Sequence, residues 1–213
     1  MTVAVKICGL TDSDAVESAI EGGVDYLGFV FFESSPRFVT PSHAAMLIEA
    51  VPETISCVGL FVDPTDSLLV EVLGQVRLDY IQLHGSETPD RVDAIRLDFG
   101  VPIIKALGVS EVRDIEAAAA FSNHADLLLF DAKPSPEADR PGGNAKSFDW
   151  SLMKSYPGTM PWLLAGGLTS ENVVTAIARS GAPCVDVSTG VESRPGHKDP
   201  SLISAFLKTA KSV

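Results

Sequence analysis

The hydrophobic residues of this chain form short runs rich in β-branched and aromatic side chains, and these runs alternate with amphipathic stretches. Eight runs have the length and composition of buried strands: 3–8, 24–31, 55–62, 79–83, 102–107, 126–131, 161–165 and 184–188. Apolar residues at helical spacing predict the helices between and after them: 12–22, 41–51, 65–76, 88–98, 111–121, 170–180 and 199–211, with a weaker and shorter helix at 148–155.

The alternation of strands and helices predicts the fold class. Alternating β and α units form a parallel sheet with right-handed crossovers. Eight such units favour a closed barrel over an open doubly wound sheet, which commonly has about five or six strands. No GxGxxG motif follows the first strand. We predict an α/β protein with one (β/α)8 TIM-barrel domain over residues 1–213. An open sheet with two misassigned strands is the alternative.

Composition and charge narrow the function classes. The chain has 213 residues, 46% of them hydrophobic, and a formal net charge of −12. This acidity argues against nucleic acid or an anionic membrane as the main partner. The apolar stretches are shorter than a membrane span, and no signal peptide is evident. The 3 cysteines are widely spaced and include no CxxC pair, which argues against disulfides and zinc knuckles and favours a cytoplasmic location.

Side chains capable of catalysis stand at most of the predicted strand ends, where barrel enzymes place their active sites. They are Cys8, Arg37, His84, Asp131 and Asp186. Each has a plainer interpretation as well: a lone cysteine is often a buried apolar residue, Asp131 could cap a helix, and His84 could be structural. A metal site is not predicted, because the other histidines do not stand at strand ends. Cys57 and Cys184 lie early in strands and are predicted to be core residues.

The first strand carries a distinctive arrangement around Cys8. Lys6 and Cys8 have the same parity, so both side chains face one side of the strand. An ammonium near the thiol is expected to lower the cysteine pKa from its ordinary value of about 8.5. Beyond the strand, Thr11 is predicted to cap the first helix, with Asp14 near its N-terminus. Cys8 and Asp131 would then form a base–acid pair across the barrel mouth.

Two glycine-rich turns near the C-terminus have the features of a phosphate site. They are Gly166-Gly167 and Ser188-Thr189-Gly190, which follow the last two strands. Barrels commonly bind phosphate there, through backbone N–H groups that need no net positive charge. The alternative is that the glycines only make tight loops. The long segment 132–147, rich in proline, glycine and charge, is either a surface excursion or a lid.

Together these motifs resemble the phosphoribosylanthranilate isomerase family of tryptophan biosynthesis. The matching segments cover essentially the whole chain in order: KICGLT (6–11), GFVFFESSPRFVTP (28–41), VGLFVD (58–63), IQLHGSE (81–87), KAL (105–107), LLFDAK (128–133), PGG and FDW within 141–150, LAGGL (164–168) and DVSTGVES with PG and KD within 186–199.

The resemblance implies a reaction and a substrate. The reaction is the Amadori rearrangement of N-(5-phosphoribosyl)anthranilate to 1-(2-carboxyphenylamino)-1-deoxyribulose 5-phosphate, the third step of tryptophan synthesis from chorismate. It requires neither metal nor cofactor. By family likeness Asp131 is the general acid that protonates the ring oxygen, and Cys8 is the general base that removes the C2′ proton. This division calls for a raised pKa at Asp131 and a lowered one at Cys8.

The resemblance also implies binding residues. Arg37 matches the position that faces the anthranilate carboxylate, and His84 and Asp186 match other pocket positions. The loops 166–167 and 188–190 match the phosphate site. The small-molecule partner is therefore a phosphorylated aminosugar, and the chain is expected to be a monomer or a homodimer.

One departure from the family pattern is visible, and alternatives remain open. The family usually has Gly-Gly-Thr-Gly where residues 142–146 read Gly-Gly-Asn-Ala-Lys, which puts the lid behaviour of this loop in doubt. The alternative enzymes are other sugar-phosphate barrels. A metal-dependent epimerase would need more ligands than His84, and the histidine-pathway isomerase would be expected to have aspartate in place of Cys8. A non-catalytic sugar-phosphate binder is the alternative outside the enzymes.

Overall fold

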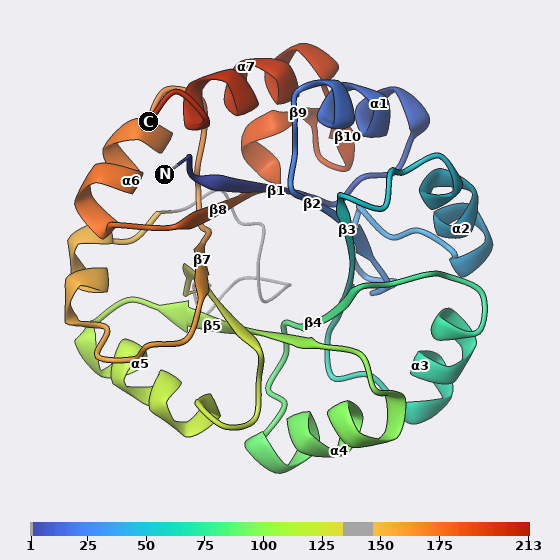
Figure 1. The fold of residues 1–213 in the computed structure, drawn as a ribbon, viewed down its shortest axis with the longest axis horizontal. Helices are drawn as coiled ribbons and strands as arrows, with labels where there is room; N and C mark the ends of the chain where they lie inside the picture. The colour runs from blue at the N-terminus through green and yellow to red at the C-terminus, as the bar shows by residue number, and fades with distance from the viewer. Residues whose placement is uncertain (1, 134–146) are drawn as a thin grey trace.

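The eight predicted strands close into one parallel barrel in the computed structural model, which describes residues 2–133 and 147–213. In ring order they are β1 (Ala4–Cys8), β2 (Tyr26–Val30), β3 (Ser56–Phe61), β4 (Tyr80–Leu83), β5 (Ile103–Val109), β6 (Leu127–Ala132), β7 (Trp162–Leu164) and β8 (Cys184–Val187). Pairing of β1 with β8 closes the ring, as the view along the barrel axis shows (Figure 1). The TIM-barrel prediction is confirmed and the open sheet is ruled out. Most of the predicted lid segment lies outside the described residues.

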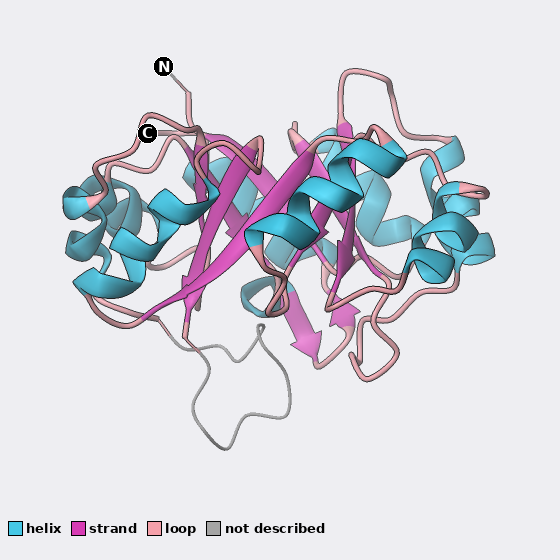
Figure 2. Ribbon diagram, turned by 90° about the horizontal axis from the view of Figure 1, so that it is seen from below, coloured by secondary structure: helices cyan, strands magenta, loops and turns pink. Residues whose placement is uncertain are grey.

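Helices surround the barrel (Figures 1 and 2). They are α1 (Ser13–Glu21), α2 (Pro41–Glu49), α3 (Asp66–Leu73), α4 (Pro89–Phe99), α5 (Val112–Glu116), α6 (Val173–Ser180) and α7 (Pro200–Ala210). The predicted helix at 111–121 divides into α5 and a 3-10 helix, η1 (Ala117–Phe121), and the weak helix at 148–155 is a 3-10 helix, η2 (Trp150–Ser155). In the described ranges, every helix is too short or too polar to cross a bilayer.

Helix α1 begins at Ser13, one residue later than a cap at Thr11 would place its start. Asp12 is the N-cap, and its Oδ1 accepts a hydrogen bond from the backbone N–H of Ala15 at 2.9 Å. The Thr11 hydroxyl instead donates to the carbonyl of Gly196 at 3.3 Å. The prediction of Thr11 as the cap was therefore wrong, because its side chain contacts the distant segment after β8. Asp14 does lie in the first turn, as expected.

Two apolar cores hold the barrel together. The larger lies between the strands and the outer helices and includes Cys57. The smaller is formed by Val58, Ile104, Ala106, Leu129, Leu163, Ala165 and Cys184, whose parity along their strands is opposite to that of the outer core. This inner core makes the barrel a packed body rather than a pore. Both Cys57 and Cys184 are buried, which confirms their prediction as core residues.

A repeated aspartate joins pairs of strands at the N-terminal end of the barrel. Asp25, Asp79 and Asp126 stand directly before β2, β4 and β6. Each carboxylate accepts the backbone N–H of a residue in the preceding strand at 2.7–2.8 Å. Each aspartate also donates its own N–H to that same residue's carbonyl, at 2.8–3.0 Å. These reciprocal bonds hold the register at the end of the barrel remote from the predicted site.

A short antiparallel hairpin, which the hydrophobic pattern did not predict, follows the last barrel strand. It consists of β9 (Glu192–Arg194) and β10 (His197–Lys198), and leads into α7. The hairpin lies next to α1 (Figure 1), consistent with the bond from Thr11 to Gly196. Its strands are too short to show a periodic pattern, so the sequence offered no signal for them.

Candidate active site

The predicted catalytic side chains lie at the C-terminal end of the barrel. Cys8 is the last residue of β1, and His84 directly follows β4. Asp131 lies near the end of β6, and Asp186 lies in β8. The polar residues Lys6, Gln82 and Asp186 are also buried in the strands, on the inward-facing parity of the inner core. The barrel interior is therefore apolar near its N-terminal end and polar near the end where catalysis takes place in TIM barrels.

Lys6 and Cys8 converge inside the barrel as their shared parity predicted. A Cβ atom added at Gly28 of the neighbouring β2 would lie 2.9 Å from Cys8 Sγ and 3.1 Å from Lys6 Nζ. Lys6 Nζ also donates to Asp186 Oδ1 at 2.8 Å, and the lysine side chain is 0% exposed. Glycine at position 28 leaves the room in which the thiol, the ammonium and the carboxylate meet.

The expected lowering of the Cys8 pKa was wrong. Burial raises the pKa of the Cys8 thiol, and the nearby Asp186 carboxylate raises it further. The Lys6 ammonium acts in the opposite direction but does not overcome burial. The sequence pattern placed the lysine correctly, yet it could not show how deeply the thiol is buried or that Asp186 binds the lysine. Lys6 stays protonated, because its carboxylate and thiol neighbours raise its pKa despite burial.

His84 and Asp131 come together through a buried glutamine. His84 Nε2 lies 3.3 Å from Asp131 Oδ2, and the amide Nε2 of Gln82 lies 3.0 Å from His84 Nδ1. An amide NH2 group can only donate, so this contact places the ring proton on Nε2, directed at Asp131. Asp131 Oδ1 accepts the backbone N–H of Ala132 at 2.7 Å. Sequence reasoning missed Gln82; its place two residues before His84, on the same face of β4, was the available signal.

The two glycine-rich loops predicted to bind phosphate lie against each other. A side chain at Gly190 would collide with the carbonyl oxygen of Leu168, next to the Gly166-Gly167 pair. Both of those glycines adopt positive φ angles, at 90° and 63°. The Asn172 side chain donates to the Gly167 carbonyl at 2.9 Å and fixes the turn. Ser188 and Thr189 follow β8 directly, so the structure brings the two predicted segments into one region.

Arg37 belongs to a cluster of charges that includes two residues which sequence reasoning missed. Its Nε and Nη2 donate to the two carboxylate oxygens of Glu192 at 2.6 and 3.0 Å, and Nη2 also donates to Thr189 Oγ1 at 3.1 Å. Lys198 Nζ donates to Glu192 at 2.8 Å and to the Ser188 carbonyl at 2.9 Å. Burial lowers the Lys198 pKa to about 8, although Glu192 opposes the shift. The hairpin thus connects Arg37 with the predicted phosphate loop.

A second buried ion pair supports the loop that carries His84. Lys105 Nζ in β5 donates to Glu87 Oε2 at 2.7 Å and to the Gly85 carbonyl at 2.8 Å. Glu87 in turn accepts the backbone N–H groups of Asp63 and Gly85 at 2.9–3.1 Å. Asp63 has a φ of 45°, unusual for a residue with a side chain. The pair therefore holds the β3 and β4 loops in one arrangement.

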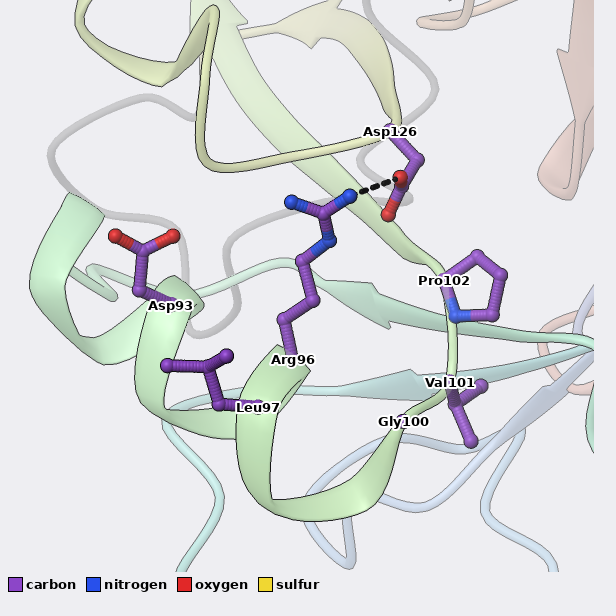
Figure 3. A pocket seen from close by; sticks show the side chains of 7 residues that line it. All are labelled: Asp93, Arg96, Leu97, Gly100, Val101, Pro102 and Asp126. Atoms are coloured by element: carbon purple, nitrogen blue, oxygen red, sulfur yellow. Dashed lines mark hydrogen bonds and ion pairs between the residues drawn. The ribbon is translucent and has the colours of Figure 1, made fainter.

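A separate surface pocket is not part of this site. It is lined by Asp93, Arg96, Leu97, Gly100, Val101, Pro102 and Asp126 (Figure 3). Arg96 Nη2 donates to Asp126 Oδ1 at 3.0 Å across its edge. Asp126 is one of the three aspartates that hold the N-terminal end of the barrel, so the pocket lies at the opposite end from Cys8 and Asp131. Over residues 2–133 and 147–213, His, Cys, Asp and Glu side chains form no group of three suited to a metal ion.

A closed (β/α)8 barrel with a thiol, a carboxyl, an imidazole and paired glycine-rich loops at its C-terminal end defines a class, the TIM-barrel enzymes that act on small phosphorylated molecules. Residues 5–209 match the family model described as N-(5′-phosphoribosyl)anthranilate isomerase. The chain therefore belongs to the N-(5′-phosphoribosyl)anthranilate isomerase family, as its motifs indicated. It is an isomerase of tryptophan biosynthesis, which sets aside the other sugar-phosphate barrels and the non-catalytic binder.

Individual relatives agree with this assignment. The N-(5′-phosphoribosyl)anthranilate isomerase of Paramagnetospirillum magneticum is 57% identical over 211 residues, covering 99% of this chain and 98% of the relative. That of Rhodospirillum rubrum is 54% identical over 97% of both chains. The crystal structure of the Thermotoga maritima enzyme superposes with a TM-score of 0.88 at 38% identity, over 99% of this chain and 100% of that one.

Proposed function

We propose that Cys8 and Asp131 are the general base and general acid with which this chain isomerises N-(5′-phosphoribosyl)anthranilate. The observation that carries the proposal is the placement of both groups at the polar end of the barrel interior, with Lys6 beside the thiol and with His84 and the Ala132 N–H beside the carboxyl. A related family structure, 35% identical with a TM-score of 0.85, is a complex with reduced 1-(o-carboxyphenylamino)-1-deoxyribulose 5-phosphate. That complex supports a phosphorylated aminosugar as the ligand here.

Asp131 starts the reaction by opening the ribose ring. Its carboxylic acid gives a proton to the ring oxygen, the C1′–O bond breaks, and the lone pair of the anilino nitrogen forms a C=N iminium bond. The carboxylate left on Asp131 accepts the Ala132 backbone N–H at 2.7 Å and faces His84 Nε2 at 3.3 Å.

Cys8 completes the rearrangement as the base. The thiolate removes the C2′ proton, and the electron pair of that C–H bond forms the C1′–C2′ double bond while the iminium electrons return to nitrogen. The resulting enolamine gains a proton at C1′ and loses one from the C2′ hydroxyl to give the ketone. Lys6 stabilises the thiolate, because its ammonium lies beside Sγ over Gly28.

The two anionic ends of the substrate are assigned to two groups of residues. The loops containing Gly166-Gly167 and Ser188-Thr189-Gly190 bind the phosphate through backbone N–H groups and hydroxyls. Arg37 binds the anthranilate carboxylate, because a guanidinium suits a planar anion and Glu192 orients it through a bidentate pair.

The remaining pocket residues are assigned to the sugar. His84 and Asp186, which lie among the polar groups at this end of the barrel, contact the sugar hydroxyls. We further propose that the enzyme works in the cytoplasm, as its three free cysteines favour. A monomer and a homodimer remain the two candidate assemblies. Sedimentation of the purified chain distinguishes them directly.

One assay tests the catalytic assignment. Purified protein is expected to quench the fluorescence of freshly made N-(5′-phosphoribosyl)anthranilate without added metal and in the presence of EDTA. Cys8→Ala is expected to lose activity by a factor of about 10²–10⁴, the range of general acid–base catalysis. Asp131→Asn is expected to lose most turnover while still binding a reduced product analogue. Full activity of Cys8→Ala would overturn the base assignment, and equal loss of binding and turnover in Asp131→Asn would make that residue structural.

A further inference from the structure

We propose that the buried Lys6–Asp186 pair is a positioning device that controls how much of the lysine's positive charge reaches the Cys8 sulfur. The inference rests on the proposed role of Cys8 as the base and goes beyond it. It assigns Lys6 a part in the reaction without contact with the reacting atoms. It also gives Asp186 a second role besides its place in the substrate pocket.

The geometry of the pair follows from barrel closure. Lys6 and Asp186 face each other directly in the register between β1 and β8, the strand pair that closes the ring. The Lys6 side chain is fully buried, and its Nζ lies 2.8 Å from Asp186 Oδ1. The same Nζ shares the space above Gly28 with Cys8 Sγ. The ammonium is therefore placed between one carboxylate and one thiol.

Three charged groups act on the Cys8 sulfur, and they come from three elements. Lys6 from β1 and Lys198 from β10 favour the thiolate, whereas Asp186 from β8 disfavours it. Gly28 of β2 brings no charge of its own. Lys6 acts on the sulfur more strongly than Asp186 does, yet burial outweighs both and raises the pKa of Cys8, which is therefore held as a thiol. Asp186 reduces the effect of the Lys6 ammonium on the sulfur. When the carboxylate binds another donor, the ammonium favours the thiolate more strongly.

A bound substrate can supply such a donor to the Asp186 carboxylate. A sugar hydroxyl that donates to Asp186 competes with Lys6 for the carboxylate and weakens its field at the sulfur. The ammonium then favours the thiolate, so the base becomes active when a substrate occupies the site. In the empty site the thiol stays protonated, which protects it from oxidation, since the thiolate is the reactive form.

A titration of the Cys8 thiol tests this inference without relying on turnover. Protein labelled with [13Cβ]cysteine is followed by NMR against pH, with the Cys8 signal assigned through Cys8→Ser. In Asp186→Asn the pKa of Cys8 is expected to fall by about one unit or more, a tenfold change in proton affinity. The rising limb of kcat/KM against pH is expected to move to lower pH by the same amount. A structural role for Asp186 would lower activity at all pH values without moving the limb.

Two further variants complete the experiment. Lys6→Met is expected to raise the pKa of Cys8, but it leaves a buried carboxylate unpaired and can prevent folding. The double variant Lys6→Met/Asp186→Asn has no charge at the pair, and its Cys8 pKa is expected to lie above that of Asp186→Asn alone. The matched control is Lys105→Met/Glu87→Gln, which changes a different buried pair and is expected to leave the pKa of Cys8 unchanged.

The outcomes separate this inference from the proposed function. An unchanged Cys8 titration in Asp186→Asn overturns the inference, whatever the activity of that variant. A pKa in the double variant as low as in Asp186→Asn overturns it as well, because Lys6 would then have no part. Full activity in Cys8→Ala overturns the base assignment instead, and the titration is independent of that result.

Discussion

The chemistry attributed to Cys8 depends on three neighbours rather than on the cysteine itself. Lys6 supplies positive charge, Asp186 withholds part of it, and Gly28 leaves the space in which they meet. Burial raises the pKa of the thiol, so the base is a strong one once it is deprotonated. His84 and Asp131 form a corresponding arrangement, in which Gln82 sets the ring proton that faces the acid.

Gly28→Ala tests the space around the base. The added Cβ would approach Cys8 Sγ to 2.9 Å and Lys6 Nζ to 3.1 Å, closer than nearly all real Cβ contacts. We expect kcat to fall by about 10- to 100-fold, corresponding to roughly 1.4–2.8 kcal/mol of lost transition-state stabilisation. Steady-state kinetics and the Cys8 titration measure the effect.

Gly108→Ala is the matched control for this substitution. It lies in β5, and its added Cβ would meet the atoms of Lys133 only at ordinary distances of 3.4 Å or more. Its kcat is expected to stay within about twofold of the parent enzyme, equivalent to about 0.4 kcal/mol. A comparable loss in both variants would show that any side chain in the barrel strands is harmful, and that the space at Gly28 is not specific.

At the scale of elements, one buried ion pair and one hairpin organise the catalytic end of the barrel. The Lys105–Glu87 pair holds the loops after β3 and β4, and thereby the position of His84. The hairpin of β9 and β10 brings Glu192 and Lys198 to Arg37 and to the loop after β8. Neither the Lys105–Glu87 pair nor the hairpin contributes a residue to the proposed chemical steps.

Removing one partner of the Lys105–Glu87 pair should be costly. Both side chains are at most 2% exposed, so Lys105→Met leaves the Glu87 charge buried and unpaired. We expect a loss of about 3–5 kcal/mol in the free energy of unfolding, measured by urea denaturation. Lys105→Met/Glu87→Gln removes the unpaired charge and is expected to recover much of that loss. Equal stability of the single and double variants would contradict a charge-pairing role.

How far the sequence predicts each element depends on the length of its pattern. The eight strands and the helices after them were predictable, because runs of apolar residues extend over whole elements. The hairpin was not, since β9 and β10 contain three and two residues. The direction of the Cys8 pKa shift could not be predicted from the sequence either. It depends first on the burial of Cys8 and then on Asp186, which is 180 positions from Lys6 in the sequence and is brought to it only by barrel closure.

The whole molecule divides into a stabilising end and a catalytic end. Asp25, Asp79 and Asp126 join strand pairs at the N-terminal end, whereas the proposed acid and base lie at the other end. The residue directly before β8 is Pro183 and not an aspartate, and its carbonyl accepts the backbone N–H of Ala4 in β1. Such a division predicts that substitutions at the N-terminal end of the barrel lower the stability and leave the activity unchanged.

Asp79→Ala tests this division. It removes a carboxylate that accepts the Cys57 backbone N–H at 2.7 Å. We expect the free energy of unfolding to fall by about 1.5–3 kcal/mol, the usual value of a hydrogen bond to a charged group. The kcat and KM measured well below the melting temperature are expected to be unchanged. The control is Glu53→Ala, which lies in an exposed loop and should change neither the stability nor the activity. An activity loss in Asp79→Ala with normal stability would contradict the division of the molecule into two ends.

The most direct test of the account is the kinetic isotope effect of a substrate carrying deuterium at C2 of the ribose. In the proposed mechanism Cys8 breaks this C–H bond, whereas Asp131 acts in the earlier ring opening. The account predicts that the isotope effect on kcat rises in Cys8→Ser, because proton removal becomes slower. It predicts that the effect falls toward unity in Asp131→Asn, because ring opening then limits the rate. The same change in both variants, or the reverse pattern, would contradict the assignment of base and acid.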